Sequence, residues 1–397
     1  MKKLIMRILR IRTACRPAAF FRQNRRLPAG IKSLSILLWP DCRRLIPGRL
    51  LRGEIPGLLV IILLLCPTQS VAVPEGRLSA VFDSTILSFF TTQFKTGTMR
   101  GAGGVAIHYA KREISGEQAA LVIVDGRTEY TTKYAELLYD LRDMPWSFYI
   151  YDHRGQGLSG RLLGDPQKGD VEKFSNYVSD LKKFIESVVK KKPHQHLFIL
   201  AHSMGGTIAI IYSLENPGVL SGMILCSPML QINTAPYPNE VARVLTATIT
   251  DLGGGDFYIF GGGPYNPARA FAGNDLTHSA ARFMLNKKIL RNFPENELGS
   301  PTFQWLNQSF KAMREAKAGA GDIRVPLLIL EGGSDTVVGR KAESDFCLQA
   351  PDCILARFPG GRHELMMEKD SIRNLVLKRI KDFIAAHCPS DGMTVVP

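Results

Sequence analysis

The chain has 397 residues, of which 45% are hydrophobic and 22% charged, with 36 Gly, 23 Pro and 7 Cys. These values exclude a disordered tail, a collagen-like fibre and a small disulfide-stapled scaffold, and they allow a large globular core. Of the net charge of +14, the first 72 residues carry +12, from 14 Lys and Arg against two acidic residues, which leaves +2 for the rest of the chain. The body of the chain is therefore almost neutral, and we expect no nucleic acid partner.

Residues 1–72 have the pattern of a basic leader that ends in a signal-like segment. The apolar run 57–66 (GLLVIILLLC) follows Arg49 and Arg52 and precedes Ser70-Val71-Ala72, which is the order of basic, apolar and cleavable parts in a secretory signal. As a helix this run would span only about 15 Å, roughly half of a bilayer core. We therefore predict cleavage after Ala72 and an exported, periplasmic or envelope-associated protein. The alternative is an uncleaved apolar segment that anchors the protein to the inner membrane.

The first 50 or so residues are rich in arginine and interrupted by prolines, and they do not have the composition of a folded segment. Two explanations stay open. The start site is placed too far upstream, or the extension is real and its Arg43-Arg44 pair belongs to a segment similar to a twin-arginine signal. Lipidation at Cys66 is a minor alternative, because Leu65 is large where a lipoprotein signal needs a small residue.

From about residue 100, short apolar runs alternate with segments of helical periodicity. This alternation is typical of a mostly parallel sheet flanked by helices on both faces. The predicted strands are residues 105–109, 120–124, 147–151, 197–200, 223–226, 327–330 and 354–358. Three segments, 134–141, 178–188 and 372–383, each carry one apolar stripe at helical spacing, which we interpret as core and not as a cofactor site.

The alternation breaks once, where almost a hundred residues separate two predicted strands. A structureless loop of this length is improbable inside a compact domain, so we interpret residues 229–325 as an inserted cap. Its glycine clusters lack the spacing of a phosphate-binding loop, and we interpret them as hinges next to the exposed or substrate-facing Phe257, Tyr258 and Phe260. The predicted organisation is a leader (1–72), an N-terminal lead-in (73–99), a first core part (100–228), the cap (229–325), a second core part (326–388) and a tail (389–397).

Four cysteines remain after the predicted cleavage. Cys226 lies in an apolar run and is expected to be buried. Cys347 and Cys353 flank a short segment, and their spacing leaves open whether they form a local disulfide in an oxidising compartment. No Cys-x-x-Cys motif occurs, and we interpret His194-Gln-His196 as a solvated turn and not as a metal pair.

The segment from Leu197 predicts a strand, a sharp turn and a helix, with Ser203 at the turn. Ala201 and Gly205 are small enough to let the chain reverse and lift the Ser203 hydroxyl above the edge of the sheet. The helix that begins near Met204 directs its free N–H groups toward that point, which favours an anion there. The usual motif is Gly-x-Ser-x-Gly, so Ala201 is a departure. The competing interpretation is an ordinary turn capped by serine.

A nucleophilic serine needs a histidine that accepts its proton and an acid that orients the histidine. In doubly wound hydrolases these residues follow in the order Ser, Asp, His, each at the end of a strand. Asp335 follows the strand at 327–330 and is the predicted acid, with Glu331 as its rival. His363 follows the last predicted strand and is the predicted base. His202 is expected to point away from its neighbour Ser203.

The loop after the strand at 120–124 is the predicted second half of an oxyanion hole. Gly126 allows a close approach of the backbone, and the N–H of Arg127 is expected to join that of Met204. Glu129 is interpreted as a buried brace of this loop. The segment 152–160 (DHRGQGLSG) is interpreted as a structural loop beside the site.

These motifs resemble the bacterial lysophospholipase L2 family, within the serine α/β-hydrolases that include monoacylglycerol lipases. The resemblance covers roughly residues 89–387 and rests on GRTEYTTKYAELLYDL (126–141), YDHRGQGLSGR (151–161), AHSMGG (201–206) and the cap segments 275–279, 301–305 and 318–322. It implies an α/β-hydrolase fold with an inserted cap, and hydrolysis of the acyl ester of a lysophospholipid through an acyl-enzyme, with no metal or organic cofactor. It assigns Ser203 as nucleophile, Asp335 as acid and His363 as base.

Two other functions stay open. A monoacylglycerol lipase or a general carboxylesterase would use the same triad, because the triad fixes acyl transfer but not the leaving group. A protein of another class, an inactive exported lipid-binding protein, would keep the fold without the chemistry. The expected partner is a lysophospholipid or another monoacyl ester, and contact with a membrane surface stays open.

Overall fold

The computed structural model describes residues 72–388. Eight strands form one sheet in the order β1-β2-β4-β3-β5-β6-β7-β8. Strand β2 pairs antiparallel with β1 and β4, and all the other neighbours are parallel. The strands are β1 (Lys95–Arg100), β2 (Ala106–Arg112), β3 (Ala119–Val124), β4 (Trp146–Tyr151), β5 (Leu197–His202), β6 (Gly222–Cys226), β7 (Leu327–Gly332) and β8 (Cys353–Phe358). The predicted mostly parallel α/β-hydrolase sheet is confirmed.

The central strands are apolar along their whole length because helices cover both of their faces. Every residue of β3, β5, β6 and β7 is buried, as expected for strands inside a parallel sheet. All seven predicted strands are present. Strand β1 was not predicted, because Met99 is its only buried residue and no apolar run marks it.

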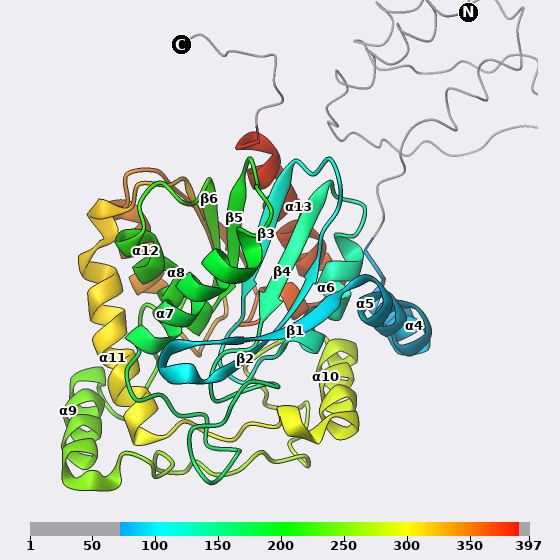
Figure 1. Ribbon diagram of the computed structural model, residues 1–397. Coiled ribbons are helices and arrows are strands. Elements are labelled where there is room, and N and C mark those ends of the chain that lie inside the picture. The colour runs from blue at the N-terminus through cyan, green and yellow to red at the C-terminus, as the bar shows by residue number, and fades with distance from the viewer. Residues whose placement is uncertain (1–71, 389–397) are drawn as a thin grey trace, which may run out of the picture. The chain divides into compact units, whose positions relative to one another are not determined.

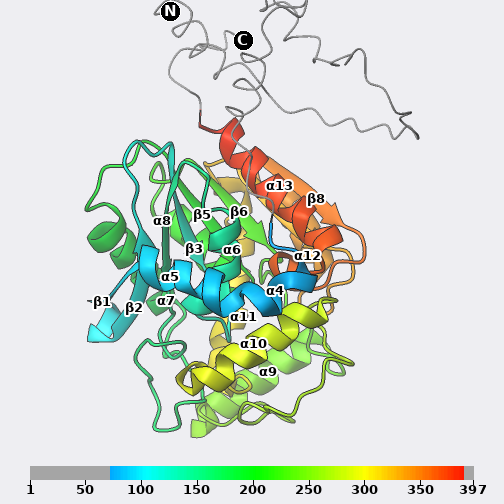
Figure 2. The same ribbon diagram turned by 90° about the vertical axis from the view of Figure 1, so that its right-hand side faces the viewer.

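Ten α-helices lie within residues 72–388. They are α4 (Glu75–Val81), α5 (Ser88–Gln93), α6 (Ala135–Asp140), α7 (Ser175–Phe184), α8 (Met204–Glu215), α9 (Asn239–Ile249), α10 (Ala280–Asn292), α11 (Phe303–Ala318), α12 (Arg340–Gln349) and α13 (Asp370–Ala386). Helices α7, α8, α11 and α12 contribute to the buried cluster on one face of the sheet, and α4, α5, α6 and α13 to the cluster on the other (Figures 1 and 2).

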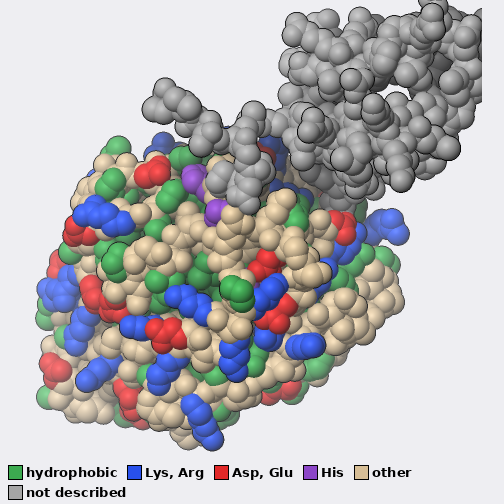
Figure 3. All heavy atoms as spheres, turned by 45° about the horizontal axis from the view of Figure 1, so that its top comes forward, with side chains coloured by type: hydrophobic (Ala, Val, Ile, Leu, Met, Phe, Trp, Pro, Cys, Tyr) green, Lys and Arg blue, Asp and Glu red, His purple; other side chains and the backbone are tan. Residues whose placement is uncertain are grey.

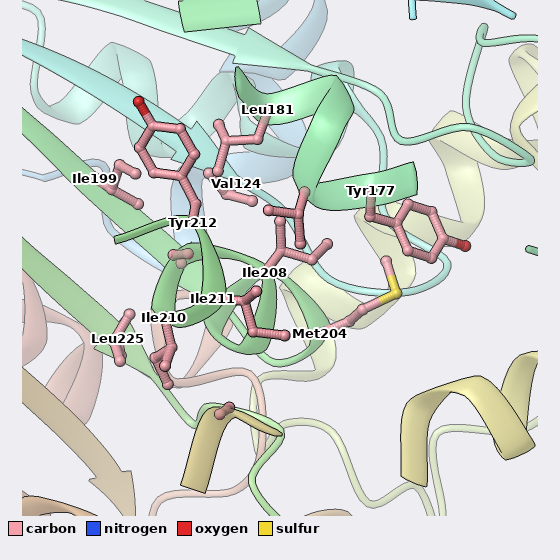
Figure 4. Close-up of a cluster of buried hydrophobic side chains, with 14 of the residues drawn as sticks. Val124, Tyr177, Leu181, Ile199, Met204, Ile208, Ile210, Ile211, Tyr212 and Leu225 are labelled. Carbon is pink, nitrogen blue, oxygen red and sulfur yellow. The ribbon is translucent and has the colours of Figure 1, made fainter. Parts of the chain in front are cut away.

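Helix α8 is the buried helix that starts at the predicted nucleophile. Its side chains Ile208 and Tyr212 pack with Val124, Ile199 and Leu225 of three adjacent strands (Figure 4). Fully burying one such aliphatic side chain contributes about 1.5–3 kcal/mol, so this packing holds the start of α8 firmly against the sheet. The turn before α8 is thereby anchored on both sides.

The segment between β6 and β7 contains α9, α10 and α11. Helix α11 packs against α9 at one end and against α8 toward the other, and its residues Ala312, Met313 and Ala316 are buried in the cluster that covers the sheet. Part of α11 therefore covers the core in addition to supporting α9. Helix α10 packs against α4 of the N-terminal segment (Figure 2). The side chains of Phe257 and Phe260 are 61% and 63% exposed.

Cys347 and Cys353 form a disulfide that joins the end of α12 to the start of β8, with their Cα atoms 5.3 Å apart. The sequence had left this pairing open. Cys226 is buried in β6, as predicted, and carries a free thiol.

The surface carries both signs of charge. Basic and acidic side chains are interspersed on the face shown in Figure 3. None of the helices described between residues 72 and 388 combines the length and apolar character needed to cross a bilayer. The predicted leader and the predicted tail lie outside the described residues.

Candidate active site

The turn between β5 and α8 has the strained backbone of a nucleophile elbow. Ser203 has φ 51° and ψ −115°, a conformation that a residue with a side chain adopts only when its surroundings impose it. A Cβ atom at Gly205 would lie 2.1 Å from the carbonyl oxygen of Val124, so only glycine fits there. Ala201 instead lies within β5 and pairs regularly with Val124 and Leu225. The elbow therefore needs the second glycine of the usual motif but accepts alanine for the first.

Of the three residues predicted as a triad, His363 lies within hydrogen-bond distance of both Ser203 and Asp335. His363 Nε2 is 3.0 Å from Ser203 Oγ, and His363 Nδ1 is 2.7 Å from Asp335 Oδ2. With the proton on Nδ1, the imidazole donates to Asp335 and leaves Nε2 free to accept the Ser203 hydroxyl. Glu331 lies inside β7 and pairs with Arg357 at 3.1 Å, so it does not approach the histidine.

Asp335 is held in place by the backbone that follows it. The N–H groups of Val337 and Val338 donate to its Oδ1 atom at 2.7 and 3.1 Å. Burial by itself would raise the pKa of Asp335, but its hydrogen bond from His363 and these two N–H donors outweigh burial and hold the pKa below its usual value. The carboxylate is thus ionised at neutral pH and able to stabilise a positive charge on His363.

The two main-chain N–H groups predicted to hold the oxyanion have no protein acceptor among the described residues. They are those of Met204, at the start of α8, and Arg127, in the loop after β3. The loop and the elbow emerge together because β3 and β5 are adjacent parallel strands, with Val124 opposite Ala201. A Cβ at Gly126 would lie 2.9 Å from both Glu129 Oε2 and His202 Nδ1, so glycine is required for this approach.

Glu129 is buried at the centre of a network below the site. It accepts hydrogen bonds from Gly126 N at 2.5 Å, from Tyr134 Oη at 2.7 Å and from Lys133 Nζ at 2.9 Å. His202 Nδ1 lies 2.9 Å from the same carboxylate. Burial would raise the pKa of Glu129, but His202 and Lys133 hold it well below its usual range. These contacts fit the predicted brace.

The same network reaches the loop that carries His363. His202 Nε2 lies 3.2 Å from the carbonyl oxygen of His363, with the two rings 4.9 Å apart. Lys133 also bonds Glu364 at 2.7 Å. His202 and Lys133 therefore connect this network to the backbone and side chain next to the predicted base, contacts that were not expected from the sequence. The sequence signal for Lys133 is its place four residues after Glu129, the spacing of an ion pair along one helical turn.

The loop at 152–160 supports the loop of Arg127. The Gln156 amide donates to the carbonyl oxygens of Gly126 at 2.8 Å and Glu129 at 2.9 Å. Arg154 forms a buried two-pronged ion pair with Asp180 at 2.7 and 2.8 Å, which ties this loop to α7. The predicted structural role agrees with these contacts.

One minor expectation was wrong. The side chain of His194 is only 3% exposed, contacts Glu117 and lies 2.9 Å from the carbonyl oxygen of Val189. It is therefore a partnered residue and not part of a solvated turn, because Glu117, from the segment before β3, supplies the partner. Between residues 72 and 388, no group of three or more His, Cys, Asp or Glu side chains is arranged to hold a metal ion.

Comparison with known proteins agrees with this geometry. A family model described as serine aminopeptidase S33 (Hydrolase_4) matches residues 115–370. The chain is 34% identical to lysophospholipase L2 of Escherichia coli K12 over 322 residues, which cover 79% of this chain and 94% of that protein.

Two solved structures share the fold. The monoglyceride lipase of Saccharomyces cerevisiae, crystallised as a soluble variant with a substrate analog, has a TM-score of 0.57 and 19% identity and covers 75% of this chain and 97% of its own. A thermostable carboxyl esterase from Bacillus coagulans has a TM-score of 0.62 and 18% identity and covers 75% of this chain and 100% of its own. The eight-stranded sheet, the matched family model and the extensive identity together establish that the chain belongs to the serine aminopeptidase S33 family of α/β-hydrolases and, within it, to the lysophospholipase L2 proteins.

Proposed function

We propose that the chain is a serine carboxylic ester hydrolase that releases the fatty acid from lysophospholipids. The observation that carries this proposal is the line of contacts from Asp335 Oδ2 through His363 to Ser203 Oγ, at 2.7 and 3.0 Å. The similarity to lysophospholipase L2 of Escherichia coli supports the choice of substrate.

In the first half of the reaction Ser203 Oγ attacks the acyl carbonyl carbon while His363 Nε2 takes its proton. The carbonyl oxygen becomes an oxyanion that accepts hydrogen bonds from the N–H groups of Met204 and Arg127. When the tetrahedral intermediate collapses, the bond to the alkoxy oxygen breaks and His363 gives the proton to the departing glycerophospho-alcohol. Each oxyanion donor is worth roughly 3–4 kcal/mol in comparable enzymes.

In the second half, water replaces the alcohol. His363 takes a proton from the water, the hydroxide attacks the acyl-enzyme, and the fatty acid leaves as Ser203 regains its proton. Asp335 stays ionised and stabilises the imidazolium formed in both halves.

The test is a side-by-side measurement of kcat/KM on lysophosphatidylcholine, monoolein and short p-nitrophenyl esters, with analysis of the lipid products. We expect lysophosphatidylcholine to be the best substrate and to yield free fatty acid and glycerophosphocholine. A preference for monoolein would favour a monoacylglycerol lipase, and a preference for the short esters would favour a general carboxylesterase.

The inactive lipid-binding alternative needs a separate experiment, because binding alone gives no product. A fluorophosphonate probe modifies a serine only where a general base activates it. We expect covalent labelling of the native protein, mapped to Ser203 by peptide mass analysis. Lipid binding without labelling would contradict the proposed enzyme.

We propose in addition that the protein is exported and cleaved after Ala72. The main-chain nitrogen of Val73 donates to Asp140 Oδ1 at 2.9 Å, so cleavage there would place a positive α-amino group against a carboxylate. The Cys347–Cys353 disulfide supports an oxidising compartment. The intact mass of the native protein is expected to correspond to residues 73–397, whereas a mass that includes residues 57–66 would indicate the membrane-anchored alternative.

A membrane surface is the proposed source of the substrate. Large apolar side chains are exposed on α9 and in the loop after it; these are Val241, Val244, Leu252, Phe257 and Phe260, each at least half exposed. Isolated exposed apolar residues are common, but a group on one segment marks an interaction site. We expect the native protein to sediment with vesicles of phosphatidylcholine. The double variant Val244→Lys/Phe257→Lys should bind these vesicles more weakly. The control Leu348→Lys, at another exposed position, should bind them as the native protein does.

A further inference from the structure

The proposed mechanism uses the main-chain N–H of Arg127 but not its side chain. Its main-chain N–H faces the oxyanion, while its guanidinium carbon lies 5.1 Å from the centre of the Trp305 ring on α11. The Nε and Nη2 atoms are inaccessible to solvent and have no hydrogen-bond partner among the described residues. A cation with at least two unused donors is therefore held beside the site.

The three arginines whose whole side chains are buried in the described chain are all paired. Arg154, Arg282 and Arg373 each form an ion pair with a carboxylate, at 2.7, 2.9 and 2.6 Å. Arg127 forms no ion pair within 4.0 Å with any acid between residues 72 and 388. The acid that interacts with it at longer range is Asp170, which accepts a hydrogen bond from Thr302 Oγ1 at 2.6 Å. Removing the donors of a charged group from water without a partner costs free energy, so the buried, unpaired Nε and Nη2 atoms of Arg127 need an explanation.

Arg127 keeps its charge at neutral pH. Burial lowers its pKa to about 10, against the raising effect of Tyr177, Tyr258 and Asp170. The Trp305 ring lies against the guanidinium in a cation–π contact, and the Nε and Nη2 donors stay unpaired.

A second cation contacts Tyr258, which interacts electrostatically with Arg127. Lys168 Nζ is 5.5 Å from the centre of the Tyr258 ring, and Lys168 has no ion pair among the described residues. Tyr258 itself interacts with Arg127 and lies 3.2 Å from Asp165 through its hydroxyl. Tyr177 and Met204, which Figure 4 labels, belong to the apolar cluster that also contains Trp305. We call Arg127, Lys168, Tyr258 and Trp305 the cationic corner.

We infer that the guanidinium of Arg127, assisted by Lys168, binds the phosphodiester of the lysophospholipid head group and makes the enzyme prefer lysophospholipids over uncharged monoacyl esters. This inference rests on the proposed function. A planar guanidinium donates two parallel, charge-assisted hydrogen bonds to a phosphate, and that geometry suits the two unused donors.

The distance from the acyl carbonyl carbon to the phosphorus of a lysophospholipid is similar to the length of the Arg127 side chain. In a lysophospholipid the phosphorus lies roughly six bonds from the acyl carbonyl carbon, and the guanidinium carbon lies roughly five bonds from its own Cα, each bond being about 1.5 Å long. Because the carbonyl oxygen is bound at the Arg127 N–H, the head group and the Arg127 side chain start from the same place and have similar reach. A monoacylglycerol ends in a hydroxyl and offers this cation no charge.

The test is a ratio of two activities in each variant, because changes at Arg127 can also disturb its main-chain N–H. We expect Arg127→Met to lower kcat/KM for lysophosphatidylcholine relative to monoolein by roughly 10- to 100-fold, the loss of one or two hydrogen bonds to a charged group. Arg127→Lys should lower this ratio less, because lysine keeps the positive charge but lacks the two parallel donors of the guanidinium. Arg314→Gln, an exposed arginine on α11, is the matched control and should keep the wild-type ratio.

Wild-type protein that hydrolyses lysophosphatidylcholine, combined with an unchanged ratio in Arg127→Met, would overturn this inference and leave the proposed function standing. Wild-type protein without lysophospholipase activity would overturn the proposed function itself.

Inhibition provides a measurement that does not depend on lysophospholipid turnover. Glycerophosphocholine should inhibit hydrolysis of a short p-nitrophenyl ester, with a Ki at least roughly tenfold higher in Arg127→Met than in the wild type. Equal Ki values in the two proteins would contradict phosphodiester binding. If Arg127→Met instead weakened inhibition by free oleate alone, the cation would recognise the carboxylate of the fatty acid product and the inference would be wrong.

Discussion

At the scale of single residues, the proposed chemistry depends on the oxygen of Ser203. Ser203→Ala removes the attacking atom and leaves only binding and oxyanion stabilisation, so we expect kcat for ester hydrolysis to fall by several orders of magnitude, roughly 10⁶ in a comparable serine enzyme. Ser213→Ala, on the same helix but away from the turn, is the matched control and should keep full activity. Near-normal turnover by Ser203→Ala would remove the assignment of the nucleophile.

Glu343 is a buried acid behind Asp335 whose two oxygens have no hydrogen-bond partner among the described residues. Burial, together with Asp335 and Glu331, raises its pKa to about 9 against the lowering effect of Arg340. Between about pH 4.5 and 9, Glu343 is therefore protonated in the folded protein but ionised in the unfolded chain, where its pKa is lower. The contribution to stability is present below this window and is lost as the pH rises through it, by up to about 1.4 kcal/mol per unit.

Glutamine has nearly the same shape as glutamate but does not ionise, so Glu343→Gln should remove this pH dependence of stability. We expect Glu343→Gln to stabilise the protein relative to the wild type by an amount that grows from pH 6 to pH 9, measured by urea unfolding at each pH. The exposed control Glu240→Gln should shift stability little and equally at all pH values. A stability difference that shrinks as the pH rises would contradict a protonated Glu343.

At the scale of elements, one arginine joins four parts of the fold. Arg282 of α10 bonds Glu136 of α6 at 2.9 Å and Asp370 of α13 at 2.8 Å, and lies 3.7 Å from Glu75 of α4. The segment between β6 and β7 is thus tied to the N-terminal segment and to the last helix by a buried cation.

Replacing Arg282 by Met removes one ion-pair partner from the buried carboxylate of Glu136. We expect a loss of about 3–5 kcal/mol in the free energy of unfolding, measured with urea. Arg324→Met breaks an exposed pair with Asp322 at 3.2 Å and should cost at most about 1 kcal/mol. Equal losses in the two variants would show that the buried cluster does not hold these elements together.

The disulfide joins two elements that are close along the chain. Cys347 and Cys353 are six positions apart, and closing such a short loop stabilises the folded state by about 2 kcal/mol in the chain-entropy model. We expect Cys347→Ser with Cys353→Ser to lose about this amount without a change in kcat. Cys388→Ser removes a free thiol and serves as the control, with stability expected to stay at the wild-type level.

At the scale of the whole molecule, three buried groups with raised pKa values all make the folded protein less stable as the pH rises above neutral. Burial raises the pKa of Glu343 to about 9 and that of Asp125 well above its usual range, and Glu129 raises the pKa of His202 against the effect of burial. Each of these groups holds a proton more tightly in the folded protein, so the stability that it contributes is lost as the pH rises through its folded pKa.

We therefore expect the midpoint of thermal unfolding to be higher at pH 6.5 than at pH 8.5. Below pH 6.5 the trend reverses in part, because burial lowers the pKa of His153 to about 4 and the unfolded chain then takes up the proton first. Calorimetry at constant ionic strength measures the unfolding midpoint on both sides of pH 6.5. A midpoint that rises steadily from pH 6.5 to 8.5 would contradict this account.

Residue patterns alone were enough to predict the order of the strands along the chain, the turn at Ser203 and the positions of Asp335 and His363. These features are local: an apolar run marks a strand buried on both faces, and small residues mark the turn that follows it. The sharing of one sheet edge by three distant loops also follows, because parallel strands place their carboxyl ends together. Strand β1 escaped the prediction, because only one of its residues is buried and no local signal exists.

The contacts between distant side chains could not be predicted in this way, because they depend on the packing of the whole fold. The contacts of His202 with the His363 carbonyl oxygen, of Lys133 with Glu364 and of Cys347 with Cys353 join residues whose pairing depends on how the loops and helices pack. The same holds for Arg127, which is left without a carboxylate although acids surround it in the sequence. Local periodicity reports which residues are buried, but not what they are buried against, because a contact across the fold depends on the packing of every element between the two partners.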